Sequence, residues 1–374
     1  LQVPFAALIL IGLIQLLPLG GQPAGADLLP GPVSAALSLN PYATRLFLYR
    51  LFLLFIFLAA AVHFLRDERL RRFVGTGVVT FGALIAFVGV LQRLASPDAI
   101  YGMRPTPQAI PFGPFVNQHH FAAMMEMTLG MTLGFLFGGT LKRDRKGLFI
   151  IAAVLMSIAV IMTGSRGGLL AAIAVVTAAF FLRPRKGTQE NTGRPWSGAA
   201  IAAGVVVLVG AAVAFLQGAD PIIRALGLQP NQEDPTSGRL HFWSVALKIF
   251  ADNPVIGAGY EAFGVAFTKY DTWNGMFRVE QAHNDYLQML ADGGVLAFAC
   301  VVAFIVLLLK NGMAAIRQAA DPAARSVAVG ALAGCIGIIA HSVVDFPLRT
   351  PSNAYFVLLL AAILTAGSIR DDRA

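Results

Sequence analysis

Apolar stretches long enough to cross a bilayer are separated in this chain by short loops, and every second loop is basic. A membrane-spanning helix needs about 20 apolar residues. The sequence predicts ten such spans, at about 3–20, 46–65, 73–94, 119–139, 147–163, 167–182, 198–217, 289–309, 325–345 and 354–369. No strand-like alternation is present, so the expected fold class is an all-α polytopic membrane protein. Because 147–163 and 167–182 are short for full spans, they can instead form a helical hairpin that turns at Thr163–Gly168.

The basic residues follow the alternation of the loops. They are Arg66, Arg69, Arg71 and Arg72, then Lys142, Arg143, Arg145 and Lys146, then Arg183, Arg185, Lys186 and Arg194. The positive-inside rule assigns these three loops to the cytosol. Both ends of the chain are then cytosolic, and nearly every unusual polar residue lies on the outer face. Since no ATP is available outside, a reaction there requires a substrate that arrives already activated.

The composition excludes an ordinary soluble domain: 57% of the residues are hydrophobic, 13% are charged, and the mean hydropathy is +0.70. A net charge of +8 would suggest nucleic acid in a soluble protein. Here the cations are topology determinants beside anionic lipid, so no nucleic-acid partner is expected. Cys300 and Cys335 lie in apolar spans without metal or redox spacing. The chain opens at Leu1 inside an apolar run, which suggests further spans upstream and about twelve in total.

One outer connection, residues 218–283, is long enough to hold structure of its own. Ser237 is placed to cap a helix whose apolar face would comprise Leu240, Trp243, Leu247 and Phe250. Asn253-Pro254 would end that helix. We therefore expect an amphipathic helix on the membrane surface or over the bundle. The expected organisation is one integrated membrane domain, with spans in 1–217 and 284–374 and this outer segment between them.

Two arginines on the outer face have neighbours that suit an anion. Arg166 lies in a Gly-Ser-Arg-Gly-Gly turn, where small residues let a phosphate approach the backbone and a guanidinium can bind two oxygens. Arg239 lies at the predicted helix start, where the helix N-terminus also favours an anion. The structural alternatives are an interfacial anchor for Arg166 and a solvated arginine for Arg239.

His283 lies where the outer segment re-enters the membrane, beside Asn284 and Asp285. Histidine is the usual general base near neutral pH, and Asp285 or another carboxylate would orient it. A purely structural histidine is the alternative.

Further polar residues lie at the outer ends of other spans. Asn117 and His120 are candidates for binding sugar hydroxyls or a phosphate, and Arg104 lies in the same outer loop. His341 and Asp345 are four residues apart, which would place them on one helix face. Ionisable groups at membrane depth normally pair or line a cavity, so a structural His–Asp contact is the alternative. Glu126 is also placed within a span and is expected to pair with a nearby arginine.

The chain has no outer Asp-x-Asp pair, no zinc-ligand spacing and no Walker loop. The candidates are arginines and histidines rather than carboxylate clusters. We therefore expect an anionic substrate that is handled without a metal, and no cofactor.

The ordered set of motifs resembles the O-antigen ligase superfamily. The set is Gly164-Ser-Arg166-Gly-Gly, then Gly238-Arg239 with Trp243 and Asn253-Pro254 to Gly257-Ala-Gly259, then His283-Asn284 to Leu287 followed by Gly293-Gly294. The resemblance covers roughly residues 110–350. The segments Asn117–Ala122 and Asp345–Leu348 also resemble those of this superfamily, and they look more like its general polysaccharide branch than like its best-known ligases.

The resemblance implies a bacterial inner-membrane glycosyltransferase of type C, with a helical bundle and a periplasmic helical cap. The implied reaction moves a glycan from undecaprenyl pyrophosphate to an acceptor hydroxyl, with inversion and without metal. The acceptor is lipid A–core in a ligase, a second carrier-linked glycan in a polymerase, or a protein Ser or Thr in some relatives.

Both lines of reasoning lead to one hypothesis for the site. The candidate catalytic residues are Arg166, Arg239 and His283, and the candidate substrate-binding residues are Arg104, Asn117, His120, Asn284, His341, Asp345 and Arg349. The arginines would hold the pyrophosphate, and His283 would orient or deprotonate the acceptor. A lipid-linked glycan transporter is the main alternative that is not an enzyme, although no inverted repeat is visible. Among the enzymes, ligase is favoured slightly over polymerase.

Overall fold

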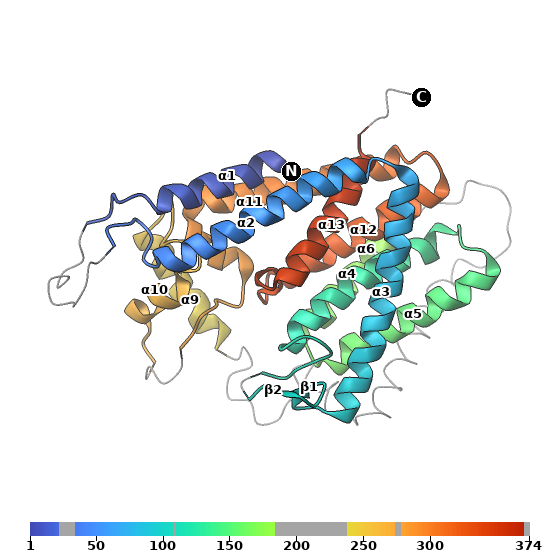
Figure 1. Ribbon diagram of the computed structural model, residues 1–374, viewed down its shortest axis with the longest axis horizontal. Coiled ribbons are helices and arrows are strands. Elements are labelled where there is room, and N and C mark those ends of the chain that lie inside the picture. The colour runs from blue at the N-terminus through green and yellow to red at the C-terminus, as the bar shows by residue number, and fades with distance from the viewer. Residues whose placement is uncertain (22–33, 108, 184–237, 274–277, 370–374) are drawn as a thin grey trace. The chain divides into compact units, whose positions relative to one another are not determined.

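The computed structural model describes residues 1–21, 34–107, 109–183, 238–273 and 278–369. The secondary structure in these ranges is almost entirely helical (Figure 1). Its α-helices are α1 (Gln2–Gln15), α2 (Pro41–Phe64), α3 (Glu68–Ala95), α4 (Gln118–Gly138), α5 (Arg143–Met162), α6 (Arg166–Leu182), α9 (Arg239–Asp252), α10 (Phe263–Tyr270), α11 (Asp285–Arg317), α12 (Pro322–His341) and α13 (Pro351–Gly367). A 3-10 helix η2 (Pro347–Arg349) and the antiparallel pair β1 (Ala99–Ile100) and β2 (Arg104–Pro105) complete the described elements. The prediction of an all-α polytopic membrane protein is confirmed.

Each predicted span that the structure describes overlaps an apolar helix, but α1 and α12 end earlier than predicted, at Gln15 and His341, and α11 is interrupted within its predicted span. Six of them, α2, α3, α4, α5, α11 and α12, are long and apolar enough to cross a membrane, and α1, α6 and α13 are shorter apolar helices. The predicted span 198–217 lies outside the described residues. Residues 143–162 form a longer helix than predicted, which is long and apolar enough to cross a membrane, and the turn before Arg166 joins it to α6.

The chain divides into two compact units. Unit 1 comprises Leu1–Ala60, Asp234–Lys310 and Ser342–Arg349, and unit 2 comprises Ala61–Glu233, Asn311–His341 and Thr350–Ala374.

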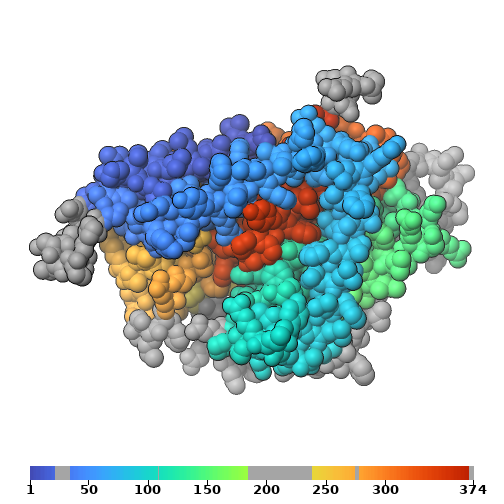
Figure 2. Space-filling view, in the orientation of Figure 1, coloured from blue at the N-terminus to red at the C-terminus, as the bar shows by residue number. Residues whose placement is uncertain are grey.

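The surface of α3 shows how a spanning helix of unit 2 meets its surroundings. This helix, light blue in Figure 2, exposes a row of large apolar side chains: Phe73, Phe81, Leu84, Phe87, Leu91 and Leu94. Large apolar side chains exposed in such numbers belong to a lipid-facing surface.

Close backbone contact between α4 and α12 forms the centre of unit 2. Helix α4 is apolar on all sides and is buried along most of its length. Gly130 and Gly134 on α4 meet Gly330 and Gly334 on α12, so each helix carries two glycines four residues apart. A β-carbon added at Gly134 would lie 2.4 Å from the Cα of Gly330. Such small-residue spacing lets helices associate in lipid through van der Waals contact.

In unit 1, aromatic and small residues pack α1 against α2 and α11. The ring centroid of Phe5 lies 5.9 Å from that of Phe55 and 6.2 Å from that of Phe304. A β-carbon added at Gly12 would lie 2.6 Å from Leu48. These contacts bring the three helices side by side (Figure 1).

The helix predicted in the long connection exists as α9, and it carries apolar residues on two sides. Its buried residues are Val245, Ala246 and Ile249, whereas Leu240 and Leu247 are exposed. Leu240 and Leu247 belong to the apolar face that the sequence predicts to lie on the membrane surface or over the bundle, and that prediction stays open. Ser237, the predicted cap, lies outside the described residues, and Gly238 precedes the helix with a left-handed backbone (φ 80°). The helix ends at Asn253 as predicted.

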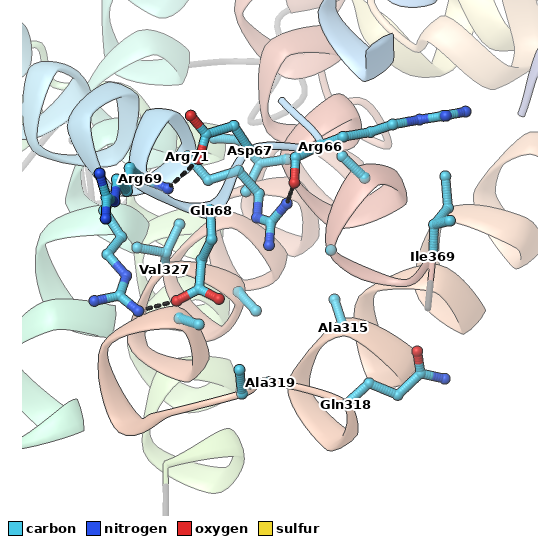
Figure 3. A pocket seen from close by; sticks show the side chains of 17 residues that line it. Arg66, Asp67, Glu68, Arg69, Arg71, Ala315, Gln318, Ala319, Val327 and Ile369 are labelled. Carbon is cyan, nitrogen blue, oxygen red and sulfur yellow. Dashed lines mark hydrogen bonds and ion pairs between the residues drawn. The ribbon is translucent and has the colours of Figure 1, made fainter. Parts of the chain in front are cut away.

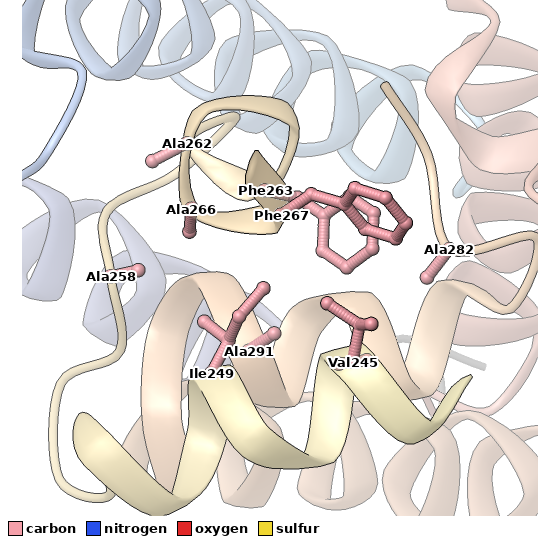
Figure 4. Packing of buried hydrophobic residues seen from close by; sticks show 10 residues of the cluster. Val245, Ile249, Ala258, Ala262, Phe263, Ala266, Phe267, Ala282 and Ala291 are labelled. Carbon is pink, nitrogen blue, oxygen red and sulfur yellow. The ribbon is translucent and has the colours of Figure 1, made fainter. Parts of the chain in front are cut away.

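The buried stripe of α9 joins a compact apolar core with α10 and the start of α11. Val245 and Ile249 face Phe263 and Phe267 of α10 (Figure 4). Ala291 of α11 closes the cluster, and the ten fully buried residues are Val245, Ala246, Ile249, Ala258, Ala262, Phe263, Ala266, Phe267, Ala282 and Ala291. The outer segment therefore has its own hydrophobic core within unit 1.

A break at Gly294 interrupts α11. Gly294 has a φ of 66° and a ψ of −170°, which frees backbone groups on both sides. The loop after α9 satisfies them: the amides of Ala258 and Gly259 donate to the carbonyls of Ala291 and Asp292 at 2.9 Å each. In two further hydrogen bonds α11 is the donor: the amide of Val295 donates to the carbonyl of Pro254 at 2.9 Å, and that of Leu296 donates to the carbonyl of Val255 at 3.3 Å.

This contact explains one glycine of each pair in the predicted motif. A β-carbon at Gly257 would lie 2.3 Å from the backbone of Asp292, and one at Gly294 would lie 2.4 Å from the backbone of Val255. The side chain of Gln15 adds to the contact by donating to the carbonyls of Ile256 at 2.6 Å and Asp292 at 2.9 Å.

We expect Gly134→Ala to destabilise the protein by about 1–3 kcal/mol, because the added methyl group overlaps the backbone of α12. The matched control is Gly77→Ala, whose β-carbon meets nothing within 4 Å among the described residues and which should be neutral or slightly stabilising. Thermal unfolding of the two purified variants in detergent measures the difference. Equal unfolding temperatures for both variants would contradict this account of the α4–α12 contact.

Candidate functional site

The carboxylate of Asp345 joins two of the three predicted catalytic residues within unit 1. Its Oδ2 atom lies 3.4 Å from Nη2 of Arg239, and its Oδ1 atom lies 3.3 Å from Nδ1 of His283. Asp345 is buried, and its Oδ1 also accepts a hydrogen bond from the amide of Phe346 at 2.9 Å. A buried carboxylate is stable only when cations and donors compensate its lost hydration, so these contacts hold both partners in place.

His283 is held between two aromatic rings and remains accessible. Its ring stacks on Phe242 of α9 with a centroid distance of 6.0 Å, and it meets the edge of Phe346 at 4.7 Å. The backbone of His283 has a φ of 50°, which is uncommon for a residue other than glycine. The side chain is 31% exposed, so a substrate can reach the ring. Because Nδ1 faces Asp345, Nε2 is the nitrogen available to an acceptor.

Arg239 is the first residue of α9. Its side chain is 18% exposed. The positive end of a helix and a guanidinium together attract an anion, and anion binding at Arg239 stays a prediction.

Asn284 and Asp285 perform structural tasks at the start of α11. The side-chain oxygen of Asn284 accepts from the amides of Tyr286 and Leu287 at 3.0 Å each, which caps the helix. Oδ2 of Asp285 accepts from the hydroxyl of Ser342 at 3.0 Å and the amide of Leu348 at 3.3 Å. The carboxylate beside His283 is therefore Asp345 rather than Asp285, although the sequence allowed either.

Arg349 is the centre of a second ionic cluster in unit 1. Its guanidinium lies 2.6 Å from Glu261, 3.2 Å from Asp292 and 4.0 Å from Asp285. Only 9% of the side chain is exposed. These carboxylates raise the pKa of Arg349 further above its usual value, although burial opposes the shift. In the described structure Arg349 ties α11 to the loop after Tyr260, and its role in substrate binding stays a prediction.

His241 belongs to a polar and aromatic group beside Arg239 that sequence reasoning missed. Its ring stacks on Trp273 at a centroid distance of 4.3 Å, and its Nε2 lies 2.9 Å from Oδ1 of Asp271. The hydrogen bonds from the amide of Trp273 and from His241 lower the pKa of Asp271. Trp273 in turn contacts Phe242, which stacks on His283. The only signal in the sequence was the position of His241 two residues after Arg239.

Arg166 begins α6 in unit 2, directly after the turn at Gly164 (φ 64°). Ser165 caps this helix by accepting from the amide of Gly168 at 3.0 Å. The Ser165 hydroxyl also lies 2.8 Å from Nδ1 of His119, a residue that sequence reasoning missed. The absence of a β-carbon at Gly168 lets α6 approach α4, since that carbon would lie 2.8 Å from Ala122. Arg166 is half-buried.

The other candidates of unit 2 lie at the start of α4 and in the loop before it. Asn117 caps α4 by accepting from the amide of His119 at 2.8 Å. Nδ1 of His120 lies 2.7 Å from the hydroxyl of Thr350. The backbone carbonyl of His120 accepts a hydrogen bond from the side-chain amide of Asn353 at 3.0 Å. Arg104 is exposed on β2. Binding roles for these residues remain predictions.

The expected pairing of His341 with Asp345 on one helix face is wrong. Helix α12 ends at His341, so Asp345 lies beyond it and the four-residue helical spacing does not apply. His341 is instead buried against Glu126 of α4, with 3.0 Å between Nδ1 and Oε1. Neither side chain is exposed to solvent, which matches the expectation that ionisable groups at membrane depth pair with one another.

Residues 151–320 match the family model described as O-antigen ligase, Wzy_C. This match confirms the resemblance of the chain to the O-antigen ligase superfamily and supports glycan transfer of the ligase or polymerase kind. The matched range contains Arg166, Arg239 and His283. No curated protein matches the chain significantly. Together with the six candidate spans, the family match supports a multi-pass membrane protein.

We expect the ion pair between Glu261 and Arg349 to stabilise the protein at neutral pH by about 1–3 kcal/mol. Burial alone would raise the pKa of Glu261, but Arg349 outweighs it and holds the pKa below the usual 4.5. Because the folded-state pKa is lowered, this stabilisation is fully present above pH 4.5 and is lost as the pH falls through the folded-state value. The unfolding temperatures of wild type and Glu261→Gln are measured from pH 7 downward. The difference between them should become smaller only below pH 4.5. A difference that is constant with pH would contradict the role assigned to the pair.

Proposed function

We propose that this protein is a glycosyltransferase that moves a glycan from undecaprenyl pyrophosphate to an acceptor hydroxyl at the periplasmic face of a bacterial inner membrane. The acceptor that we favour is lipid A–core, which makes the protein an O-antigen ligase. The proposal includes cytosolic chain ends and one integrated membrane domain, with residues 218–283 as a periplasmic segment. The basic loops support this topology through the positive-inside rule.

One observation carries the proposal: Arg239 and His283 meet at the buried carboxylate of Asp345. An anion-binding arginine beside an accessible, oriented histidine suits a donor with a phosphate leaving group and an acceptor with a hydroxyl. The family match supports the same class of reaction. A transporter of lipid-linked glycans has no need of a histidine oriented in this way.

In the proposed reaction the acceptor oxygen attacks the anomeric carbon of the donor glycan. The new carbon–oxygen bond forms while the bond to the pyrophosphate breaks on the opposite side, which inverts the configuration. Nε2 of His283 takes the acceptor proton, and Asp345, which lies beside Nδ1 of the same ring, stabilises the imidazolium that results. Arg239 and Arg166 bind phosphate oxygens and stabilise the charge that develops as the pyrophosphate leaves.

The acceptor is tested with purified protein in lipid and a natural undecaprenyl-pyrophosphate glycan, with and without lipid A–core. Products are separated by size and by the lipid attached. Glycan on lipid A–core supports the ligase. A lengthening ladder on the polyprenyl carrier that is independent of lipid A–core would instead establish a polymerase. A glycan that changes side without changing its attachment would establish a transporter.

We expect Arg166→Lys, Arg239→Lys and His283→Ala each to lower the transfer rate by about 100-fold or more at normal expression. Lysine keeps the charge but not the planar fork that binds two phosphate oxygens. The matched controls are Arg143→Lys and His63→Ala, which alter exposed residues of unit 2 in or beside predicted cytosolic loops. Wild-type transfer by the three site variants would refute the assignment.

Asp345→Asn tests whether the carboxylate orients His283. We expect kcat to fall by about 10-fold to 100-fold while the KM of the donor changes little, because the amide keeps the volume but cannot stabilise the imidazolium. The rate of single-turnover transfer measures this effect, and thermal unfolding shows whether the variant is folded. A rise in KM at constant kcat would assign Asp345 to substrate binding instead.

A further inference from the structure

A cavity of about 900 Å³ lies within unit 2, and none of its lining residues belongs to the proposed reaction. The loop between α2 and α3 and the first turn of α3 line one side of it, with Arg66, Arg69, Arg71 and Arg72. The end of α11, the start of α12 and the end of α13 line the rest. Figure 3 shows Arg71 and Glu68 on one side and Ala315, Gln318 and Ala319 facing them.

The charged side of the cavity is built from an ordered set of contacts. Arg71 donates to the carbonyls of Leu65 and Arg66 at 2.7 Å each, which fixes its guanidinium at the cavity wall. Arg72 pairs with both Glu68 and Asp321. Within the described ranges, the guanidinium groups of Arg66 and Arg69 have no carboxylate partner. Four arginines therefore face two lining carboxylates, those of Asp67 and Glu68, and the cavity has a net positive charge.

The opposite side of the cavity is apolar. Small and branched side chains in or just beyond three helices form it, namely Ala315, Ala319, Val327, Ala328, Ile363 and Ile369. A soluble anion would use only the arginines. A ligand that needs both sides has a phosphate group joined to a hydrocarbon chain. Basic pockets between transmembrane helices on the cytosolic side bind lipid headgroups in this manner.

We propose that this cavity binds one anionic phospholipid, with its phosphate on the arginine-rich wall formed by the α2–α3 loop and the start of α3, and the start of its acyl chains against α11, α12 and α13. The loop is one of those assigned to the cytosol, so the lipid belongs to the cytosolic leaflet. The proposal is independent of the glycan transfer proposed above, because none of its residues takes part in that reaction.

The test titrates the purified full chain in detergent with phosphatidylglycerol or phosphatidylcholine and counts bound lipids by native mass spectrometry. We expect R66Q/R69Q to weaken phosphatidylglycerol binding about tenfold, since each cation near an anionic lipid contributes several-fold. The matched control, R143Q/R145Q, removes two charges from another predicted cytosolic loop and should bind as wild type does. Equal losses in both double variants, or equal binding of the two lipids, would overturn the proposal.

A second variant tests the apolar side without changing the charge. Ala319→Phe places a ring in the cavity from a half-buried position between α11 and α12, and we expect it to lower phosphatidylglycerol binding several-fold while thermal unfolding stays at the wild-type temperature. Wild-type lipid binding by this variant would show that the acyl chains do not enter. Displacement of the lipid by an equal concentration of inorganic phosphate would identify a soluble-anion site and would also overturn the proposal.

Discussion

A hydrogen-bonding constraint at the break in α11 organises unit 1. Backbone groups that a helix leaves unpaired cannot be abandoned at membrane depth, because lipid offers no donors or acceptors. The loop after α9 supplies four backbone hydrogen bonds to the interrupted helix, from Ala258 and Gly259 and to Pro254 and Val255. Only glycine permits so close an approach at Gly257 and Gly294. The same contact fixes the loop that connects α9 to α10, and the apolar core then positions α9 and the segment that carries His283.

Segment 342–349 supplies the electrostatic counterpart of that constraint. Asp345 compensates the charge of Arg239 and lies against His283, and Arg349 compensates three carboxylates, those of Glu261, Asp285 and Asp292. Charges buried without partners would each cost several kcal/mol. Two clusters built on one short segment thus join the outer helix α9 to the start of α11. The cluster with the exposed histidine suits chemistry, whereas the buried cluster around Arg349 suits structural support.

Several residues of the candidate site could be identified from the sequence, but the residues with which they pair could not. Arg166 and Arg239 were found because each starts a helix after a glycine-containing turn, and His283 because it precedes one. The partner of His283 was left open between Asp285 and another carboxylate, and the structure shows Asp345 beside it. His341 was paired with the wrong acid because the helix was assumed to continue through Asp345. His119 and His241 were missed, since their neighbours Ser165, Asp271 and Trp273 are distant in sequence or lie across a turn.

By itself the sequence determined the class of the protein and the helices that the structure describes, and it predicts the assignment of the loops to two faces of a membrane. These properties follow from hydropathy and charge, which are local and can be summed along a window of about 20 residues. Only the tertiary structure decided which stripe of α9 is buried, how the break at Gly294 is satisfied, and which acid each histidine faces. These outcomes depend on contacts between residues tens to hundreds of positions apart. Several partners compete for each buried polar group, and the one that the packing brings within hydrogen-bonding distance prevails.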